Sequence, residues 1–443
     1  MTSSSEAAAA PAVVAAAAAE RMPSPSPSVP TSAPAMRVPI PPRGVDYRGK
    51  VVLAPMVRSG ELPARLLALH YGADLVWGPE TVDRSMIGTT RRLNPRTHML
   101  EWSRLPTNPQ ALANNPFVAE SVIYRMDPVR EAGKLIFQIG TSDPERAVAA
   151  ARTVAADVAG IDVNAGCPKP FSTTGGMGAM LLQTPEKLAS ILEALVREIT
   201  PAFGIGISVK IRLLEEPERT AALVRRLVAT GITGLTVHCR TTPMRPRERA
   251  IRGQLRMVAD ICREAGVACV MNGDVENRDT ALSLIEEYAV DGAMIATTAE
   301  KNSSVFRAGG EKDPWRMAVE RYMRYAIEVE NKFGNTKFTL TQMIPGKEEV
   351  YRELAACDGY RAVVETLGFK GLVEVAAALD KRLRIGGGEK KETKKQAKKR
   401  KWVDTAAAEG TSGKKSANNG NNGKKTEMAP AEAVAAIAAG ASF

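Results

Sequence analysis

Short apolar runs alternate with longer amphipathic segments between residues 51 and 297, and this alternation restricts the fold more than any other feature of the chain. Continuous apolar runs are typical of parallel strands that are covered on both faces. Segments such as PERAVAAARTVAAD (144–157) have apolar residues three and four positions apart, as in helices. Eight such units over about 250 residues predict a (β/α)8 TIM barrel at 47–310. The runs are VVLAPM (51–56), ADLVWGPE (73–80), LIFQIGT (135–141), GIDVNAGCP (160–168), ISVKIRL (207–213), LTVHCRT (235–241), ACVMNGDV (268–275) and GAMIAT (292–297).

The rest of the chain follows other patterns. Residues 311–385 have helical periodicity without a strand signal, which predicts a small all-helical domain after the barrel. Residues 1–46 are rich in Ala, Pro and Ser, and residues 386–443 are rich in Lys, Gly and Asn. Such segments bury too little apolar surface to offset their ordering entropy, so we expect two disordered tails.

Charge and cysteine content exclude several classes of protein. Most of the net charge of +11 comes from the segment after residue 380, where 15 Lys/Arg face 6 Asp/Glu, so the charge alone is weak support for a nucleic-acid-binding fold. The five cysteines have no CxxC spacing, which argues against a zinc site and a disulfide framework. No apolar run is long enough to span a bilayer. We expect a monomer in the cytoplasm or nucleus, with a mitochondrial location left open.

Polar side chains stand where nearly every predicted strand ends. Active sites of such barrels form at the carboxyl ends of the strands, so these side chains should converge on one rim. A single buried polar residue is usually a satisfied core group, whereas several at one rim predict a ligand site. The residues are Gln138, Asn164, Cys167, Lys210, Arg212, His238, Arg240, Asn272 and Asp274.

The donors and acceptors of this set suit a planar heteroaromatic ring. Lys210 and His238 offer donors, and Gln138 and Asn272 can each donate and accept. Glycines near the last two strands are typical of phosphate binding in TIM barrels. Flavin mononucleotide (FMN) accounts for both the ring-binding side chains and the phosphate-binding glycines, whereas a sugar phosphate accounts only for the glycines.

Seven ordered blocks within residues 50–375 resemble the tRNA-dihydrouridine synthases, and their wording is most similar to the eukaryotic subgroup that modifies position 20 of tRNA (type 2). A lone NGD would mean little, but seven blocks in order are specific. The blocks are LAPM (53–56), FQIGTSD (137–143), DVNAGCPKP (162–170), GGMGAMLL (175–182), VKIR (209–212), VHCRTTPMRPRERA (237–250) and NGDV (272–275).

The resemblance implies an FMN enzyme that reduces the C5=C6 bond of a tRNA uridine, with NADPH or NADH as electron donor and no metal. Cys167 would donate the proton to C5, and Asn164 would help to place the uracil. One departure concerns strand eight, where the family usually has Arg and this chain has Thr297. The implied FMN residues are Pro55, Met56, Val57, Gln138, Lys210, His238, Asn272, Gly273, Asp274, Ala296 and Thr297.

A uridine in folded tRNA must be extruded to reach a barrel-top flavin, which requires phosphate contacts around the mouth. The segment after strand six supplies many arginines against the single acid Glu248. The expected RNA contacts are Lys169, Arg212, Arg240, Arg245 and Arg247.

Three alternatives remain open at this point. The chain could be a flavin barrel that acts on free pyrimidines, as dihydroorotate dehydrogenases do. It could be a catalytically silent tRNA-binding paralogue, given Thr297. A sugar-phosphate aldolase or isomerase would need a Schiff-base lysine or paired acids, and Lys210 alone does not establish one.

Overall fold

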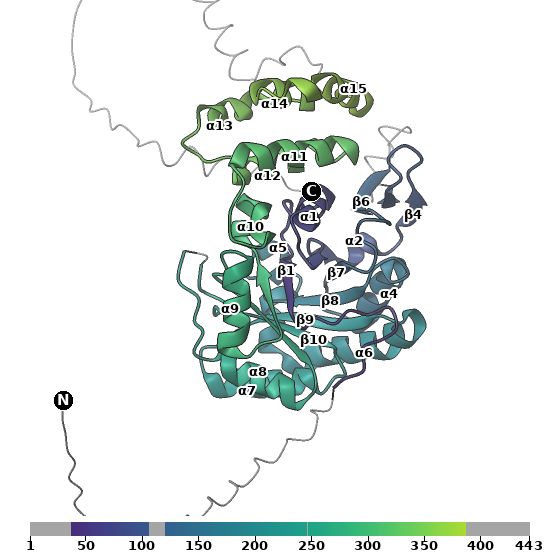
Figure 1. Ribbon diagram of the computed structural model, residues 1–443. Helices are drawn as coiled ribbons and strands as arrows, with labels where there is room; N and C mark the ends of the chain where they lie inside the picture. The colour runs from purple at the N-terminus through teal and green to yellow at the C-terminus, as the bar shows by residue number, and fades with distance from the viewer. Residues whose placement is uncertain (1–36, 106–119, 246, 387–443) are drawn as a thin grey trace, which may run out of the picture. The chain divides into compact units, whose positions relative to one another are not determined.

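Parallel strands close into a barrel in the computed structural model, which describes residues 37–105, 120–245 and 247–386 (Figure 1). Each strand pairs with its neighbours in the chain, and the last strand, β12, returns to pair with β1. This closure confirms the predicted TIM barrel. The barrel strands are β1 (Lys50–Leu53), β2 (Leu75–Trp77), β3 (Thr81–Val82), β7 (Leu135–Gly140), β8 (Gly160–Ala165), β9 (Gly206–Arg212), β10 (Gly234–His238), β11 (Ala268–Asn272) and β12 (Gly292–Ile295).

The second strand of the barrel is broken into β2 and β3. Both pieces pair with β7, through Val76 to Leu135 and Thr81 to Ile139. The sequence predicts one strand over 73–80, but residues 78–80 belong to neither strand, although the Gly78 amide still donates to the Ile136 carbonyl of β7. Tyr124 occupies the space beside the break, since a Cβ on Gly78 would lie 2.2 Å from its hydroxyl oxygen.

Helices follow the barrel strands as the periodicity predicts. In α4, the Asp143 side chain caps the first turn by accepting from the Arg146 amide, and Ala147, Ala151 and Val154 face the barrel. The other helices of this part are α1 (Leu62–His70), α2 (Asp83–Met86), α5 (Pro170–Thr173), α6 (Pro185–Phe203), α7 (Pro217–Val228), α8 (Leu255–Glu264), α9 (Arg278–Tyr288) and α10 (Thr297–Lys301), and α4 itself spans Pro144–Val154.

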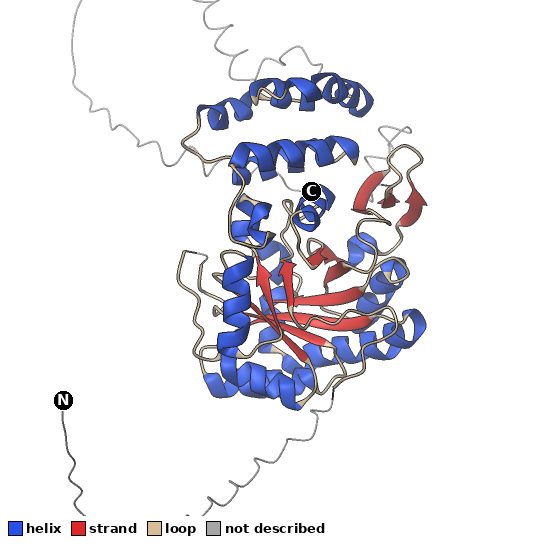
Figure 2. Cartoon of the chain, in the orientation of Figure 1, coloured by secondary structure: helices blue, strands red, loops and turns tan. Residues whose placement is uncertain are grey.

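A three-stranded antiparallel sheet, absent from the sequence prediction, interrupts the barrel between β3 and β7 (Figure 2). Its strands are β4 (Thr90–Leu93), β5 (Leu100–Arg104) and β6 (Ser121–Met126). The sheet is anchored on the end of α4, where the Trp102 indole donates to the Thr153 carbonyl and Arg91 pairs with Asp157. Its short strands mix charged and apolar residues, so they lack the continuous apolar signal of the barrel strands.

Residues 37–46, which the sequence assigns to a disordered tail, make specific contacts with the barrel. The Val38 amide donates to the Gly266 carbonyl, and the Arg43 guanidinium donates to the carbonyls of Ala156 and Phe203. The predicted tail therefore includes ten ordered residues, 37–46. Amino-acid composition cannot show that a guanidinium is bound by backbone carbonyls. The remainder of that tail, and residues 387–443 of the tail predicted at 386–443, lie outside the described residues.

Helices alone make up the chain after residue 311 in the described part, as the sequence predicts (Figure 2). They belong to one compact unit with the barrel. None of the helices in the described ranges is long and apolar enough to cross a membrane. The helices after residue 311 are α11 (Trp315–Glu328), α12 (Phe333–Met343), α13 (Glu349–Glu353), α14 (Tyr360–Thr366) and α15 (Val373–Leu383).

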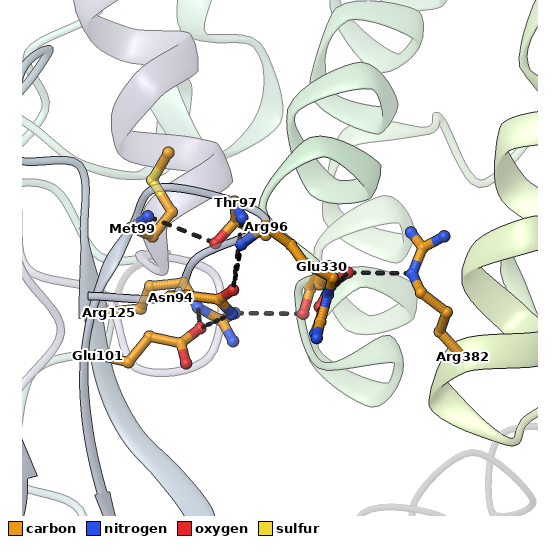
Figure 3. A network of polar contacts seen from close by, with 8 residues as sticks. All are labelled: Asn94, Arg96, Thr97, Met99, Glu101, Arg125, Glu330 and Arg382. Atoms are coloured by element: carbon orange, nitrogen blue, oxygen red, sulfur yellow. Dashed lines mark hydrogen bonds and ion pairs between the residues drawn. The ribbon is translucent and has the colours of Figure 1, made fainter. Parts of the chain in front are cut away.

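Glu330 connects these helices to the antiparallel sheet (Figure 3). Its carboxylate pairs with Arg96 from the β4–β5 turn and with Arg382 from α15. Its backbone carbonyl accepts from Arg125 of β6, which also pairs with Glu101 of β5. One residue thereby joins the sheet, the end of α11 and the last helix.

A fully buried ion pair holds α1 against the segment after β6. The Arg65 Nε lies 2.6 Å from the Glu131 carboxylate, and both side chains are at most 1% exposed. Arg65 also donates to the carbonyls of Gly60 and Arg125, and Glu131 accepts from the Asp127 amide. Each charge therefore has several partners, which is the condition under which a buried pair is tolerated.

We predict that Glu131→Ala lowers the free energy of unfolding by about 3–5 kcal/mol, because it leaves a buried guanidinium unpaired. Urea denaturation measures the change. The control is Glu320→Ala, which removes the exposed Arg324–Glu320 pair of α11 and should cost less than about 1 kcal/mol. Equal losses in the two variants would contradict the prediction.

Candidate active site

A cavity of about 390 Å³ opens at the carboxyl ends of the barrel strands. It brings together most of the side chains that the sequence singles out, from seven different strands or the loops after them. Its volume lies within the range of small-molecule sites. The predicted residues in its lining are Pro55, Met56, Val57, Gln138, Asn164, Cys167, Lys169, Lys210, Arg212, His238, Asn272, Ala296 and Thr297.

Lys210 and Asn272 form a hydrogen-bonded pair inside this cavity. The Lys210 ammonium donates to the Asn272 side-chain oxygen at 3.0 Å, and the Asn272 amide donates to the Met294 carbonyl at 2.9 Å. Burial lowers the pKa of Lys210 to about 8, and the charge of Arg212 adds to the effect. Lys210 is thus an ammonium donor at neutral pH that loses its proton more readily than a surface lysine.

Gln138 is oriented by a residue that the sequence analysis missed. Its amide nitrogen donates to the buried Asp162 carboxylate at 2.8 Å, and Ser208 donates to the other carboxylate oxygen. Burial raises the pKa of Asp162 to about 6. The bond fixes the Gln138 amide so that its carbonyl points away from Asp162. Asp162 stands in the DVNAGCP block, but a buried acid on a strand gives no separate signal.

His238 is held neutral. Burial and the charges of Lys210, Arg212 and Arg240 lower its pKa far below the ordinary value. The Arg240 guanidinium lies 3.2 Å from His238 Nε2. Because a guanidinium can only donate, Nε2 must accept, and the ring proton is on Nδ1. His238 is therefore a neutral hydrogen-bonding group and not a cation.

A second cavity of about 290 Å³ adjoins the first and shares His238, Asn272, Ala296 and Thr297 with it. Gly273 and Asp274 line this part, together with Arg240, which pairs with Asp274. Gly273 has a φ of +122°, and a Cβ there would lie 3.4 Å from the His238 ring. Glycine thus keeps the loop close to the histidine.

The two cavities fit FMN by the chemistry of their donors. The first offers an ammonium, an oriented amide and a neutral imidazole, which suit the carbonyls and ring nitrogens of a flavin. The second has the glycine turn at Gly273 and the backbone amides at the start of α10 for a phosphate, while the charge of Arg240 is already paired with Asp274.

The loop of Cys167 is shaped by Asn164. The Asn164 side-chain oxygen accepts from the amides of Gly166 and Cys167, at 2.9 and 3.1 Å. The Cys167 carbonyl accepts from the Ala179 amide. Gly178 has a φ of +58°, and a Cβ there would lie 2.5 Å from the Cys167 carbonyl oxygen. Asn164 therefore acts on the turn that presents the cysteine, and the turn requires glycine at 178.

The Cys167 thiol keeps its proton at neutral pH. Burial raises its pKa, and the negative charge of Glu80 adds to the increase. The Lys169 amide and the charges of Lys169 and Arg212 act in the opposite direction but are outweighed. Burial and Glu80 therefore outweigh Lys169 and Arg212 in their effect on the pKa of this thiol.

Two arginines that the sequence assigns to RNA contacts are buried and hold the site together. Arg212 donates to the carbonyls of Gly166 and Thr241, so it clamps the loops after β8 and β10. Arg240 donates to the Glu248 carbonyl and pairs with Asp274. Arg245 and Arg247 are exposed. The sequence does not distinguish the two buried arginines from the two exposed ones, because all four lie at or after the end of a strand.

Several residues of the lining were not singled out from the sequence. Glu80 lies in the break between β2 and β3, and Glu300 accepts from Ser59 across the mouth. Phe338 and Gln342 come from α12, so a helix beyond the barrel completes the cavity wall. The acid at the end of the 73–80 run was a usable signal for Glu80. Periodicity could not identify the two α12 residues.

The described ranges contain no group of three or more His, Cys, Asp or Glu side chains arranged to hold a metal ion.

Comparison with known proteins relates this site to one family. The family model for dihydrouridine synthase matches residues 52–360. The tRNA-dihydrouridine(20) synthase [NAD(P)+] of Schizosaccharomyces pombe is 48% identical over 68% of this chain and 61% of its own length. Its counterpart of the same name in Saccharomyces cerevisiae is 42% identical over 71% of this chain and 82% of its own length. Both names agree with the position-20 subgroup that the sequence blocks resemble.

Among solved structures, dihydroorotate dehydrogenase from Eimeria tenella matches 66% of this chain and 84% of its own, with 15% identity and a TM-score of 0.36. The match of the family model over most of the chain decides the assignment: this chain belongs to the dihydrouridine synthase family.

Proposed function

We propose that this protein reduces the C5=C6 bond of a uridine at position 20 of tRNA to dihydrouridine, with FMN as cofactor and NADPH or NADH as electron donor. The observation that carries the proposal is a partly buried cysteine, Cys167, in the same cavity as a set of donors that suits a flavin. The names of the two yeast relatives support the substrate and the electron donor.

Bound FMN would supply the hydride to C6 of the uracil. Lys210, Gln138 and His238 would hold the flavin, because their donors and acceptors are fixed by Asn272, Asp162 and Arg240. Such fixed partners mean that little reorganisation is needed when the ring binds.

Cys167 would supply the proton. Hydride addition at C6 leaves negative charge at C5, and a thiol with a raised pKa still has a proton to donate there at neutral pH. The Asn164-capped turn holds the thiol at the cavity wall. Asn164, whose side-chain oxygen is used by the turn, can approach the uracil only with its amide nitrogen.

The exposed arginines beside the mouth favour an RNA substrate over a free pyrimidine. Arg245, Arg247 and Arg249 are solvent-exposed on the segment after β10, where a phosphate backbone could reach them. A free pyrimidine such as orotate has no use for such a rim. Turnover of orotate or uracil, without turnover of tRNA, would favour the alternative.

We predict that Cys167→Ala lowers dihydrouridine formation by about 10²–10⁴-fold, the usual contribution of a general acid. Purified protein is supplied with FMN, NADPH and unmodified tRNA, and dihydrouridine is mapped along the product. The control is Cys357→Ala, a buried cysteine of the helical part that should leave the rate unchanged. Normal activity of the Cys167 variant would remove this residue from the mechanism.

We also predict that FMN binding weakens as pH rises from 7 to 9. Free Lys210 loses its proton near pH 8, and a flavin that accepts from the ammonium favours the protonated form, so binding takes up a proton above this pH. The expected loss of affinity is about tenfold at pH 9. Quenching of flavin fluorescence measures it, and Lys210→Met should remove the pH dependence. A wild-type affinity that does not change with pH refutes the prediction.

A third prediction concerns the exposed rim. Arg247→Ala should weaken tRNA binding and reduce the slope of log affinity against log salt by about 1, the effect of one lost phosphate contact. Filter binding at several salt concentrations measures the slope. Arg197→Ala, an equally exposed arginine near the end of α6, is the control and should leave the slope as in wild type. Identical slopes in both variants would place the RNA elsewhere.

A further inference from the structure

A buried carboxyl group lies beside the cysteine without a complete set of partners. Glu80 is 9% exposed, and its Oε1 accepts from the Ser172 hydroxyl at 2.9 Å. Its Oε2 is buried and makes no hydrogen bond of good geometry. Glu80 and Cys167 line the same cavity. An unpaired buried oxygen is costly, so its retention calls for an explanation.

The surrounding backbone leaves room for this carboxyl. Glu80 lies where the second barrel strand is broken, between β2 and β3. A Cβ on Gly140 of β7 would lie 2.5 Å from Glu80 Oε1, and a Cβ on Gly178 would lie 2.4 Å from the Ser172 hydroxyl. Two glycines on different elements thus allow Glu80 and Ser172 to meet beneath the cysteine loop.

Glu80 and Cys167 also interact electrostatically. Burial raises the pKa of Glu80, while Ser172, Asn164, Cys167 and the charge of Lys169 partly oppose the increase. The carboxylate in turn contributes to the raised pKa of Cys167, against Lys169 and Arg212. The charge of Lys210 also couples to the thiol. These are the charged groups that bear on the pair.

We propose that Glu80 acts through Cys167 as its proton partner: it keeps the thiol protonated and restores the proton after each turnover. This proposal rests on the proposed function of the cysteine. When the thiol has given its proton to C5 of the uracil, a thiolate remains. The Glu80 carboxylate then takes up a proton from solvent beside the new thiolate and passes it to Sγ. The O–H bond of the carboxyl breaks as the S–H bond forms, and Glu80 returns to the carboxylate.

The first test measures the thiol directly and needs neither tRNA nor flavin. The full-length protein is alkylated with iodoacetamide from pH 6 to 10, and modification of the Cys167 peptide is followed by mass spectrometry. Only the thiolate reacts, so the profile reports the pKa of the thiol. Removal of the negative charge in Glu80→Gln should lower that pKa and increase the rate at pH 7.5 by about threefold or more.

Two variants separate charge from structure. Ser172→Ala removes the hydrogen bond but keeps the carboxylate, and Glu80→Asp keeps the charge on a shorter side chain. Both should leave the profile closer to wild type than Glu80→Gln does. If Glu80 only holds the loop, the two loop-disturbing variants shift the profile as much as Glu80→Gln, and this result overturns the proposal.

The second test addresses proton return. At pH 6.5, where the thiol starts protonated, reduced Glu80→Gln enzyme should complete its first turnover on tRNA at the wild-type rate. Its steady-state rate should fall at least about tenfold, because the thiolate waits for a proton from solvent. A wild-type steady-state rate would overturn proton return by Glu80. Absence of any first turnover with wild-type enzyme would instead refute the proposed function, and the alkylation profile would still stand as a separate result.

Discussion

Three cations enclosed at one rim of the barrel govern the chemistry of this site. Lys210, Arg212 and Arg240 end neighbouring strands or follow them, and their mutual repulsion cannot be relieved by moving apart. Each is instead held by acceptors on the protein: an amide oxygen, backbone carbonyls and the Asp274 carboxylate. Burial, together with the charges of these cations, lowers the pKa of His238 and keeps it neutral. A flavin ring would therefore meet donors whose protonation is set before it binds.

The cysteine experiences a different field only one loop away. Burial and Glu80 favour its thiol form, although Lys169 and Arg212 favour the thiolate. From the sequence alone, the nearby Lys169 would suggest that Cys167 is a thiolate. The outcome depends on which groups share the buried space, and Glu80 reaches that space from a strand some 87 positions earlier in the chain. Within one cavity, Glu80 thus acts on the cysteine, whereas Arg212 acts on the cysteine, Lys210 and His238 alike.

The barrel could be predicted from sequence because its signal is local: each strand is a continuous apolar run, and closure follows from their number. The rim residues followed for the same reason, since parallel strands place their ends together. The antiparallel sheet at 90–126 was missed because β4 is exposed at all four residues and β6 mixes exposed and buried residues, so neither has a continuous apolar run. The direction in which a long side chain points also could not be predicted from the sequence. Arg212 and Arg247 both follow strands, but only burial and carbonyl partners show that the first is a clamp.

The junction at Glu330 has a consequence for how the helical part is held. Its carboxylate and carbonyl tie the antiparallel sheet, α11 and α15 to one another, and α12 contributes Phe338 and Gln342 to the cavity wall. Helices tied in this way cannot swing freely on the barrel. The helical part is thus joined to the rest of the protein twice, through the ion pairs of Glu330 at the antiparallel sheet and through the α12 residues at the cavity wall.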